Sequence, residues 1–169
     1  MDALDLSLER EHTLLLVVDM QERLAAAMDP GAFGRVLANA QILLQGAARL
    51  GLPVLATEQY PRGLGPTVGP IRERLDALSV KPIEKVEFSC ARAPGFTDAL
   101  ESLTEQDTIV LVGMEAHVCV YQTALDLLAR GLRVHIPADA ALLNWAASLL
   151  ALPGLATKML RTMIMVSSR

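Results

Sequence analysis

The stretch TLLLVVD, from Thr13 to Asp19, decides the fold class of this chain. It is a run of leucine, valine and one threonine that ends in an acid, which is typical of a strand buried on both faces of a parallel sheet. The stretch DTIVLV, residues 107–112, repeats the pattern, and Gly113 ends it. The two runs therefore predict a sheet with helices on both sides.

Helical patterns alternate with strand patterns along the chain. Apolar residues at helical spacing occupy residues 34–50 and 116–130, and each pattern stops at a glycine, a common residue at a helix C-terminus. We expect further strands at 53–57, within 81–88 with its end near Lys85, at 132–137 and at 162–166, further helices at 71–78, 95–103 and 142–160, and a loop at 60–70. This alternation predicts a three-layer α/β/α fold with a mostly parallel, Rossmann-like sheet.

Composition favours a single domain spanning residues 1–169. The chain has 169 residues, of which 52% are hydrophobic and 4% aromatic, so one large core of small aliphatic side chains is expected. Nineteen acidic against 15 basic residues give a net charge of -4, which provides no basic footprint for nucleic acid or an anionic membrane. A small-molecule partner fits this balance better.

The two ends of the chain differ in character. Residues 1–12 form a charged N-terminal extension without an apolar signal core, so we expect a cytoplasmic protein whose Cys90 and Cys119 are free thiols. The atypical C-terminal segment, residues 140–169, carries only three charges. Its apolar part is interrupted by Pro153 and falls short of the roughly 20 residues that span a bilayer, which predicts a buried or interface helix.

Polar residues fall where the predicted strands end, and α/β folds bind ligands at this edge. These positions are Asp19, Glu58, Lys85, the turn 113–119 and Asp139. Cys119 lies in the first turn of a predicted helix, where free N–H groups and the helix dipole favour a thiolate. Asp19 and Lys85 would supply the base and the cation that a nucleophilic thiol needs. The alternatives are a helix N-cap at Asp19, a solvent-facing strand residue at Lys85 and an inert buried thiol at Cys119.

Several segments resemble the isochorismatase-like cysteine hydrolase superfamily. They are LLLVVDMQERL (14–24), KVEF with the following serine (85–89), VGMEAHVCVYQTALDLLARG (112–131) and VHIPADA (134–140). The stretch TEQYPRGLGPTV (57–68), together with MEAHVCVYQTALDLL, is similar to the isochorismatase domain-containing subgroup. The resemblance runs from about residue 12 to residue 140 and implies a six-stranded parallel sheet.

The resemblance also implies a catalytic site. It implies a triad of Asp19, Lys85 and Cys119, a cis peptide bond between Met114 and Glu115, and an oxyanion hole made by the backbone N–H groups of Glu115 and Cys119. In the expected mechanism Asp19 accepts the thiol proton, Lys85 stabilises the thiolate, and Cys119 attacks a carbonyl to form a thioester that water hydrolyses. Four further residues are expected to line the substrate pocket: Gln21, Gln59, Tyr60 and His117.

This sequence departs from the family pattern in two places. Metal-dependent nicotinamidases of the superfamily carry several histidines in the loop after the second strand, but residues 57–70 contain none, so we expect no metal and no cofactor. After Asp139 the polar turn and charged helix of the family are replaced by apolar residues, and we expect the C-terminal helix to be missing. A second copy would then cover the exposed apolar surface, which predicts a homo-oligomer.

Three hypotheses for function follow. The leading one is a cysteine hydrolase of a small amide or a related C–N or acyl bond, since members that cleave the vinyl ether of isochorismate lack the nucleophilic cysteine. The alternative is a catalytically silent member that acts as a binding or scaffold protein. A nucleotide-binding α/β domain is a third hypothesis, but the chain has no GxGxxG or P-loop sequence.

Overall fold

The computed structural model describes residues 7–142. Its sheet contains β1 (Thr13–Val18), β2 (Val54–Gln59), β3 (Ile83–Lys85), β4 (Thr108–Met114), β5 (Arg133–His135) and β6 (Ala141–Leu142). The strand order is β3-β2-β1-β4-β5, β6 pairs with β4, and every one of these pairs is parallel. The predicted α/β class with a six-stranded parallel sheet is confirmed.

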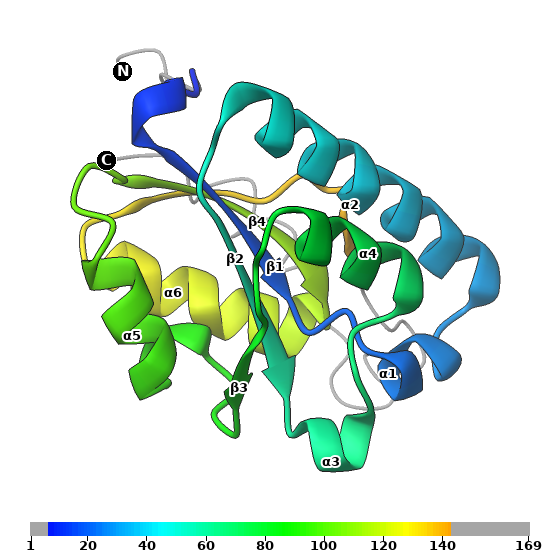
Figure 1. The fold of residues 1–169 in the computed structure, drawn as a ribbon. Coiled ribbons are helices and arrows are strands. Elements are labelled where there is room, and N and C mark those ends of the chain that lie inside the picture. Colours follow the sequence, from blue (N-terminus) through cyan, green and yellow to red (C-terminus); the bar gives the residue numbers. More distant parts are fainter. Residues whose placement is uncertain (1–6, 143–169) are drawn as a thin grey trace, which may run out of the picture.

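Helices cover both faces of the sheet (Figure 1). One face carries α2 (Pro30–Leu50) and α4 (Gly69–Ala77), and the other carries α5 (Pro94–Glu101) and α6 (Tyr121–Ala129). Successive side chains of a strand point to opposite faces, so Leu15 packs in the first core and Leu14 and Leu16 in the second. Burial on both faces explains why this strand is apolar throughout.

The short elements add detail that the sequence patterns did not predict. They are η1 (Arg10–His12), α1 (Glu22–Ala26), α3 (Pro61–Leu64), η2 (Cys90–Arg92) and the π-helical turn η3 (Ala116–Val120). The expected loop at 60–70 contains α3, because a proline at its first turn favours a helix start. The helix expected over 116–130 divides into η3 and α6. The helix expected at 142–160 and the strand expected at 162–166 lie outside the described residues, apart from Leu142, which belongs to β6.

Gly113 allows β1 and β4 to lie side by side near their carboxyl ends. Its φ is 133°, a conformation that side chains other than glycine rarely adopt. A Cβ atom at this position would overlap the backbone carbonyl of Val18, its partner in β1. The close approach of the two strands therefore depends on glycine here.

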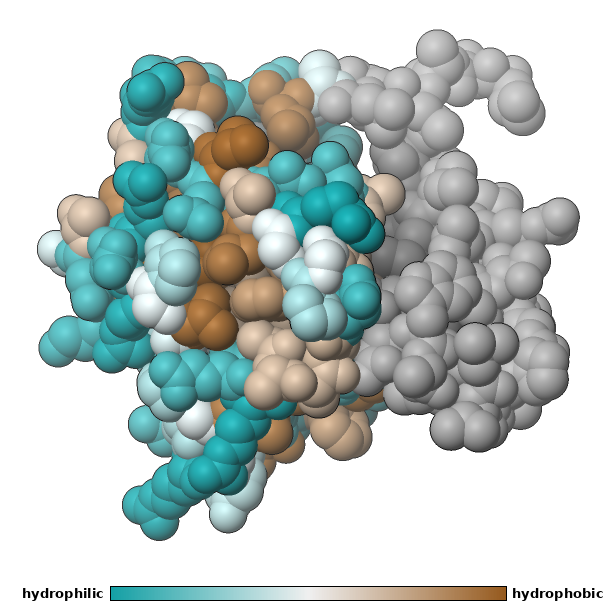
Figure 2. All heavy atoms as spheres, turned by 90° about the vertical axis from the view of Figure 1, so that its right-hand side faces the viewer, coloured by the Kyte–Doolittle hydropathy of each residue, from teal (hydrophilic) through white to brown (hydrophobic). Residues whose placement is uncertain are grey.

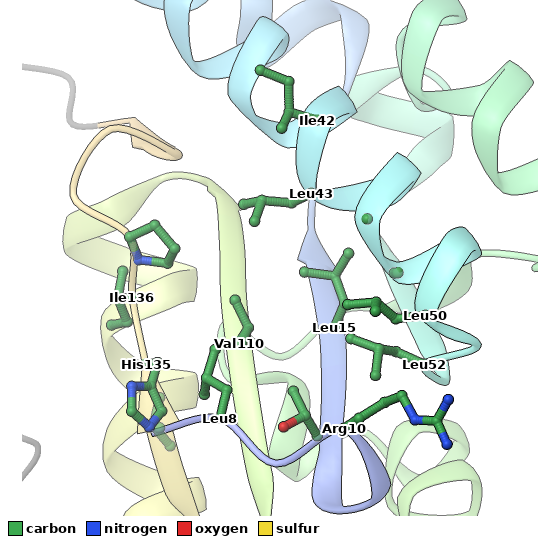
Figure 3. A pocket seen from close by; sticks show the side chains of 15 residues that line it. Leu8, Arg10, Leu15, Ile42, Leu43, Leu50, Leu52, Val110, His135 and Ile136 are labelled. Atoms are coloured by element: carbon green, nitrogen blue, oxygen red, sulfur yellow. The ribbon is translucent and has the colours of Figure 1, made fainter. Parts of the chain in front are cut away.

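A cavity of about 830 Å³ lies on the face that carries α2. Figure 3 shows Leu15 and Val110 of the sheet and Leu43 of α2 pointing into it. Leu8, Ile42 and Leu50 also line the cavity and are 51%, 63% and 53% exposed. Figure 2 looks onto the side of the molecule on which α2 and α4 lie and shows hydrophobic side chains among polar ones there.

In the described part of the chain, no helix has the length and apolar character that crossing a membrane requires.

Candidate active site

The site is built where β1 ends between its two neighbours. Val18, the last residue of β1, pairs with Thr57 in β2 and with Gly113 in β4, and Asp19 follows directly. On the next strand, Lys85 of β3 pairs with Gln59 of β2. The parallel register thus brings Asp19, Thr57 and Lys85 to the same edge of the sheet, where α1 and α3 also lie (Figure 1).

Lys85 and Asp19 form a buried ion pair. The Lys85 Nζ donates to Asp19 Oδ2 at 2.7 Å, and neither side chain is exposed. Burial disfavours the ammonium, but the negative charge of Asp19 and the hydrogen bond to it act in the opposite direction, and the pKa of Lys85 lies above its ordinary value. The two alternatives for these residues are therefore wrong: Lys85 does not face solvent, and the N-cap of α1 is Gln21, not Asp19.

The Lys85 ammonium has further acceptors around it. Its Nζ also donates to Gln59 Oε1 at 2.6 Å and contacts the carbonyl oxygens of Glu87 at 3.2 Å and Phe88 at 3.3 Å. An ammonium has three protons, so these groups replace the water that burial removes. The cation is thereby fixed beside the carboxylate.

The second oxygen of Asp19 is held by β2. Thr57 Oγ1 donates to Asp19 Oδ1 at 2.8 Å, and the Asp19 backbone N–H donates to the Thr57 carbonyl at 3.1 Å. Asp19 has a φ of 50°, in the left-handed region that non-glycine residues seldom occupy. Such conformations cluster at functional sites, where surrounding contacts impose them.

Cys119 shares the same carboxylate. It lies in η3, is 5% exposed, and is close enough to Asp19 for the charge of the carboxylate to act on its thiol. Burial, followed by the negative charge of Asp19, raises the pKa of Cys119 to about 12, although Lys85 acts in the opposite direction. The helix position was expected to favour the thiolate, but burial and the carboxylate act against it, so the neutral thiol of Cys119 is favoured at neutral pH.

A second thiol lies against this cluster. Cys90 is fully buried, and its Sγ is 3.5 Å from Thr57 Oγ1. Burial and the charge of Asp19 raise the pKa of Cys90 to about 11. Both cysteines are free thiols. Sequence reasoning missed Thr57 and Cys90: the end of a predicted strand could have indicated Thr57, whereas no pattern indicated Cys90.

The backbone before Cys119 has the form that the resemblance implies. The peptide bond between Met114 and Glu115 is cis. The Glu115 carbonyl accepts the N–H groups of Val118 at 3.1 Å and Val120 at 3.3 Å, which closes the turn around Cys119. An oxyanion hole at Glu115 and Cys119 stays a prediction.

The two expected glutamine residues have hydrogen-bond partners within the fold. Gln21 is fully buried; its Oε1 accepts the Gln59 N–H at 2.7 Å, and its Nε2 donates to the carbonyls of Gln59 at 3.0 Å and Gly65 at 2.6 Å. It thus joins the end of β1 to the loop after β2. Gln59 uses its Oε1 for Lys85 and its Nε2 for the Val86 carbonyl at 2.9 Å.

Tyr60 and His117 differ from these glutamines. Tyr60 follows Gln59 and is 54% exposed, with its ring against Gly63. His117 lies two residues before Cys119, and its buried Nδ1 has no hydrogen-bond partner among residues 7–142. A buried polar atom normally has a partner, so a ligand atom would satisfy this nitrogen.

Two other polar residues at strand ends do not belong to the cluster. Glu58 lies between Thr57 and Gln59 in β2 and therefore points to the opposite face. There its carboxylate accepts from the N–H and hydroxyl of Thr67, at 2.7 Å and 2.6 Å, and from Arg72 at 3.3 Å. Asp139 lies in the loop before β6, where its backbone carbonyl accepts from Asn39.

A metal-binding cluster is not present among residues 7–142, where no three His, Cys, Asp or Glu side chains lie close enough to hold an ion. The site chemistry that the described residues offer is that of a thiol, a carboxylate and an ammonium.

Comparison with known proteins shows extensive similarity. The family model of the Isochorismatase domain matches residues 13–148. Isochorismatase domain-containing protein 1 from Salmo salar is 44% identical over 128 residues, which cover 75% of this chain and 43% of that protein. The chain thus spans less than half the length of this curated relative.

Solved structures share the fold. The structure of MAR1 ribonuclease from Caenorhabditis elegans has a TM-score of 0.78 and 33% sequence identity, covering 94% of this chain and 76% of that one. The YcaC gene product from Escherichia coli, described as an octameric hydrolase of unknown specificity, has a TM-score of 0.78 at 20% identity, covering 97% and 76%. At this identity the second likeness shows the fold alone.

Proposed function

This chain belongs to the isochorismatase family, and on that premise we propose that it is a cysteine hydrolase of a small amide or a related C–N or acyl bond. One observation carries the proposal. The Asp19 carboxylate is paired with Lys85 at 2.7 Å, and Cys119 lies close enough for the charge of Asp19 to act on its thiol. A base, a cation and a nucleophile therefore meet at the edge where α/β sheets bind their ligands.

The geometry supports a mechanism that starts from a neutral thiol. Cys119 Sγ attacks the carbonyl carbon while its proton moves to Asp19, and the carbonyl electrons move to oxygen, beside the N–H groups of Glu115 and Cys119. When the C–N bond breaks, Asp19 returns the proton to the amine. Water then attacks the thioester, giving one proton to Asp19, which passes it to the departing Cys119 sulfur. Lys85 stays charged and balances Asp19 throughout.

The test is a screen of small amides and imides with the purified protein. Turnover by the wild type, with a thioester mass at Cys119, is the expected result. Cys119→Ala should abolish turnover because no other group in the mechanism attacks the carbonyl, whereas Cys90→Ala should reduce it without abolishing it. Turnover retained by a folded Cys119→Ala variant would overturn the assignment.

Two other functions remain as outcomes of the same screen. A catalytically silent binding or scaffold protein would form no thioester with any amide, imide or activated ester. The Caenorhabditis elegans neighbour bears the name ribonuclease, but a net charge of -4 disfavours binding to RNA. RNA cleavage that disappears in Cys119→Ala would favour that activity over amide hydrolysis.

We also propose the setting in which the enzyme works. Its substrate is a small molecule, with Tyr60 and His117 beside it, while Gln21 and Gln59 hold the site residues in place. No nucleic acid, membrane or cofactor is required by this chemistry. The octameric assembly described for YcaC is compatible with a homo-oligomer here. A cytoplasmic location stays a prediction from the sequence.

A further inference from the structure

We propose that Thr57 and Cys90 are positioning residues, whose hydroxyl and thiol form a hydrogen-bond chain that holds the Asp19 carboxylate ready to accept the Cys119 proton. This inference rests on the proposed hydrolase function. It also gives the two buried thiols of the chain different roles: Cys119 is the nucleophile, and Cys90 is a permanent hydrogen-bond donor.

The direction of the hydrogen bonds from Cys90 through Thr57 to Asp19 follows from the protons available. An ionised carboxylate only accepts, so the single Thr57 hydroxyl proton is directed at Asp19 Oδ1, 2.8 Å away. Thr57 Oγ1 must then act as the acceptor in its 3.5 Å contact with Cys90 Sγ. The order is therefore Cys90 S–H to Thr57 O–H to Asp19. Burial keeps the pKa of Cys90 at about 11, which leaves its thiol protonated at neutral pH.

Both positioning residues are rigidly placed. Thr57 is 1% exposed and Cys90 is 0% exposed, so water does not compete for their hydrogen bonds. Thr57 is fixed by its strand pairing with Val18. Cys90 is fixed by its own N–H, which donates to Thr123 Oγ1 at 2.9 Å. Neither group can turn away without breaking a buried contact.

This hydrogen-bond chain holds the Asp19 carboxylate at the oxygen that Lys85 does not contact. Thr57 holds Oδ1 and Lys85 holds Oδ2, so the carboxylate plane is set and its remaining lone pairs are available to Cys119. A hydrogen bond to the ionised form of an acid also stabilises that form. Loss of the Thr57 hydroxyl should therefore move the acid limb of the reaction, where the base becomes protonated, to higher pH.

The experiment measures acylation of the enzyme by p-nitrophenyl acetate across pH, using the burst of p-nitrophenolate. In this reaction the Cys119 S–C bond forms, the ester C–O bond breaks, p-nitrophenolate leaves and the thiol proton goes to Asp19. Thr57→Val should slow the burst about tenfold and move its acid limb up by about one pH unit. Thr57→Ser keeps the hydroxyl and should restore the wild-type limb.

Thr108→Val is the matched control. Thr108 is also a buried strand threonine whose Oγ1 donates to an aspartate, Asp107, at 2.7 Å, but it begins β4 at the opposite edge of the sheet. Its substitution removes the same kind of hydrogen bond and should leave the acid limb unchanged. A general loss of stability would affect both threonine variants, whereas a positioning role affects only Thr57.

The Cys90 variants test the first hydrogen bond of the series, from Cys90 to Thr57. Cys90→Ala should move the limb in the same direction as Thr57→Val but less, and Cys90→Ser, which keeps a donor, should not move it. These variants decide the question if Thr57→Val fails to fold by circular dichroism. An unmoved limb in Cys90→Ala, or in folded Thr57→Val, overturns the positioning role. Equal bursts from wild type and Cys119→Ala instead overturn the hydrolase proposal itself.

Discussion

At the scale of single residues, the site depends on the buried charges of Asp19 and Lys85, which are balanced by each other and by neighbouring hydrogen-bond partners. Asp19 and Lys85 are both fully buried, and their side chains are 2.7 Å apart. Removing one partner of such a pair typically costs about 3–5 kcal/mol, because the other charge is left buried without compensation. Variants of this pair therefore need a readout that separates chemistry from folding.

Asp19→Asn should lower the pKa of Cys119 while abolishing hydrolysis. After burial, the charge of Asp19 is the largest cause that raises this pKa, which stands at about 12, and a neutral amide removes that charge. The rate of iodoacetamide labelling at Cys119, followed by peptide mass spectrometry across pH, should thus begin to rise at lower pH than in the wild type. A labelling profile unchanged or moved to higher pH would contradict this account.

The sequence predicts which residues lie close together but not their pKa values or their hydrogen-bond partners. Asp19 and Lys85 end strands and Cys119 follows one, so the topology of a parallel sheet was enough to bring them together. The raised pKa of Cys119 depends on burial and on the charge of Asp19, which no spacing reveals. The contact of Cys90 with Thr57 depends in the same way on a packing distance between segments 33 residues apart.

At the scale of elements, β2 serves both faces of the sheet through the alternation of its side chains. Thr57 and Gln59 reach Asp19 and Lys85, while Glu58 between them binds Thr67 at the other face. The strand ends were predicted well because apolar runs mark them. The end of β3 was predicted near Lys85, which is its last residue, and the backbone after it turns to bring carbonyl oxygens to the Lys85 ammonium.

Gly113→Ala should destabilise the pairing of β1 with β4. The new methyl group would overlap the Val18 carbonyl, and alanine is strained at a φ of 133°. We expect the free energy of unfolding to fall by about 2 kcal/mol or more, measured by urea denaturation followed by circular dichroism. Gly34→Ala in α2 is the matched control: a Cβ there meets nothing within 4 Å, so the helix should gain up to about 1 kcal/mol. Equal stability of the two variants would contradict the proposed close approach at Gly113.

At the scale of the whole molecule, the candidate active site and the exposed apolar surface lie at different places. The Asp19, Lys85 and Cys119 cluster lies at the carboxyl edge of the sheet, whereas the cavity on the α2 side is lined by other residues. Fully burying a leucine or isoleucine contributes about 1.5–3 kcal/mol. Exposed side chains of this kind around one cavity are therefore a source of association energy.

The expected homo-oligomer can be tested at this apolar surface. Wild-type protein at micromolar concentration should scatter light as a particle larger than the 18.2 kDa chain. The double variant Ile42→Lys and Leu50→Lys should shift it toward the monomer, because these side chains are 63% and 53% exposed and burying lysine ammonium groups is unfavourable. Leu125→Lys, at a position 41% exposed on α6 of the opposite face, should leave the mass unchanged. A monomeric wild type would contradict the oligomer, and an equal response to all of these lysine substitutions would contradict an interface on the α2 side.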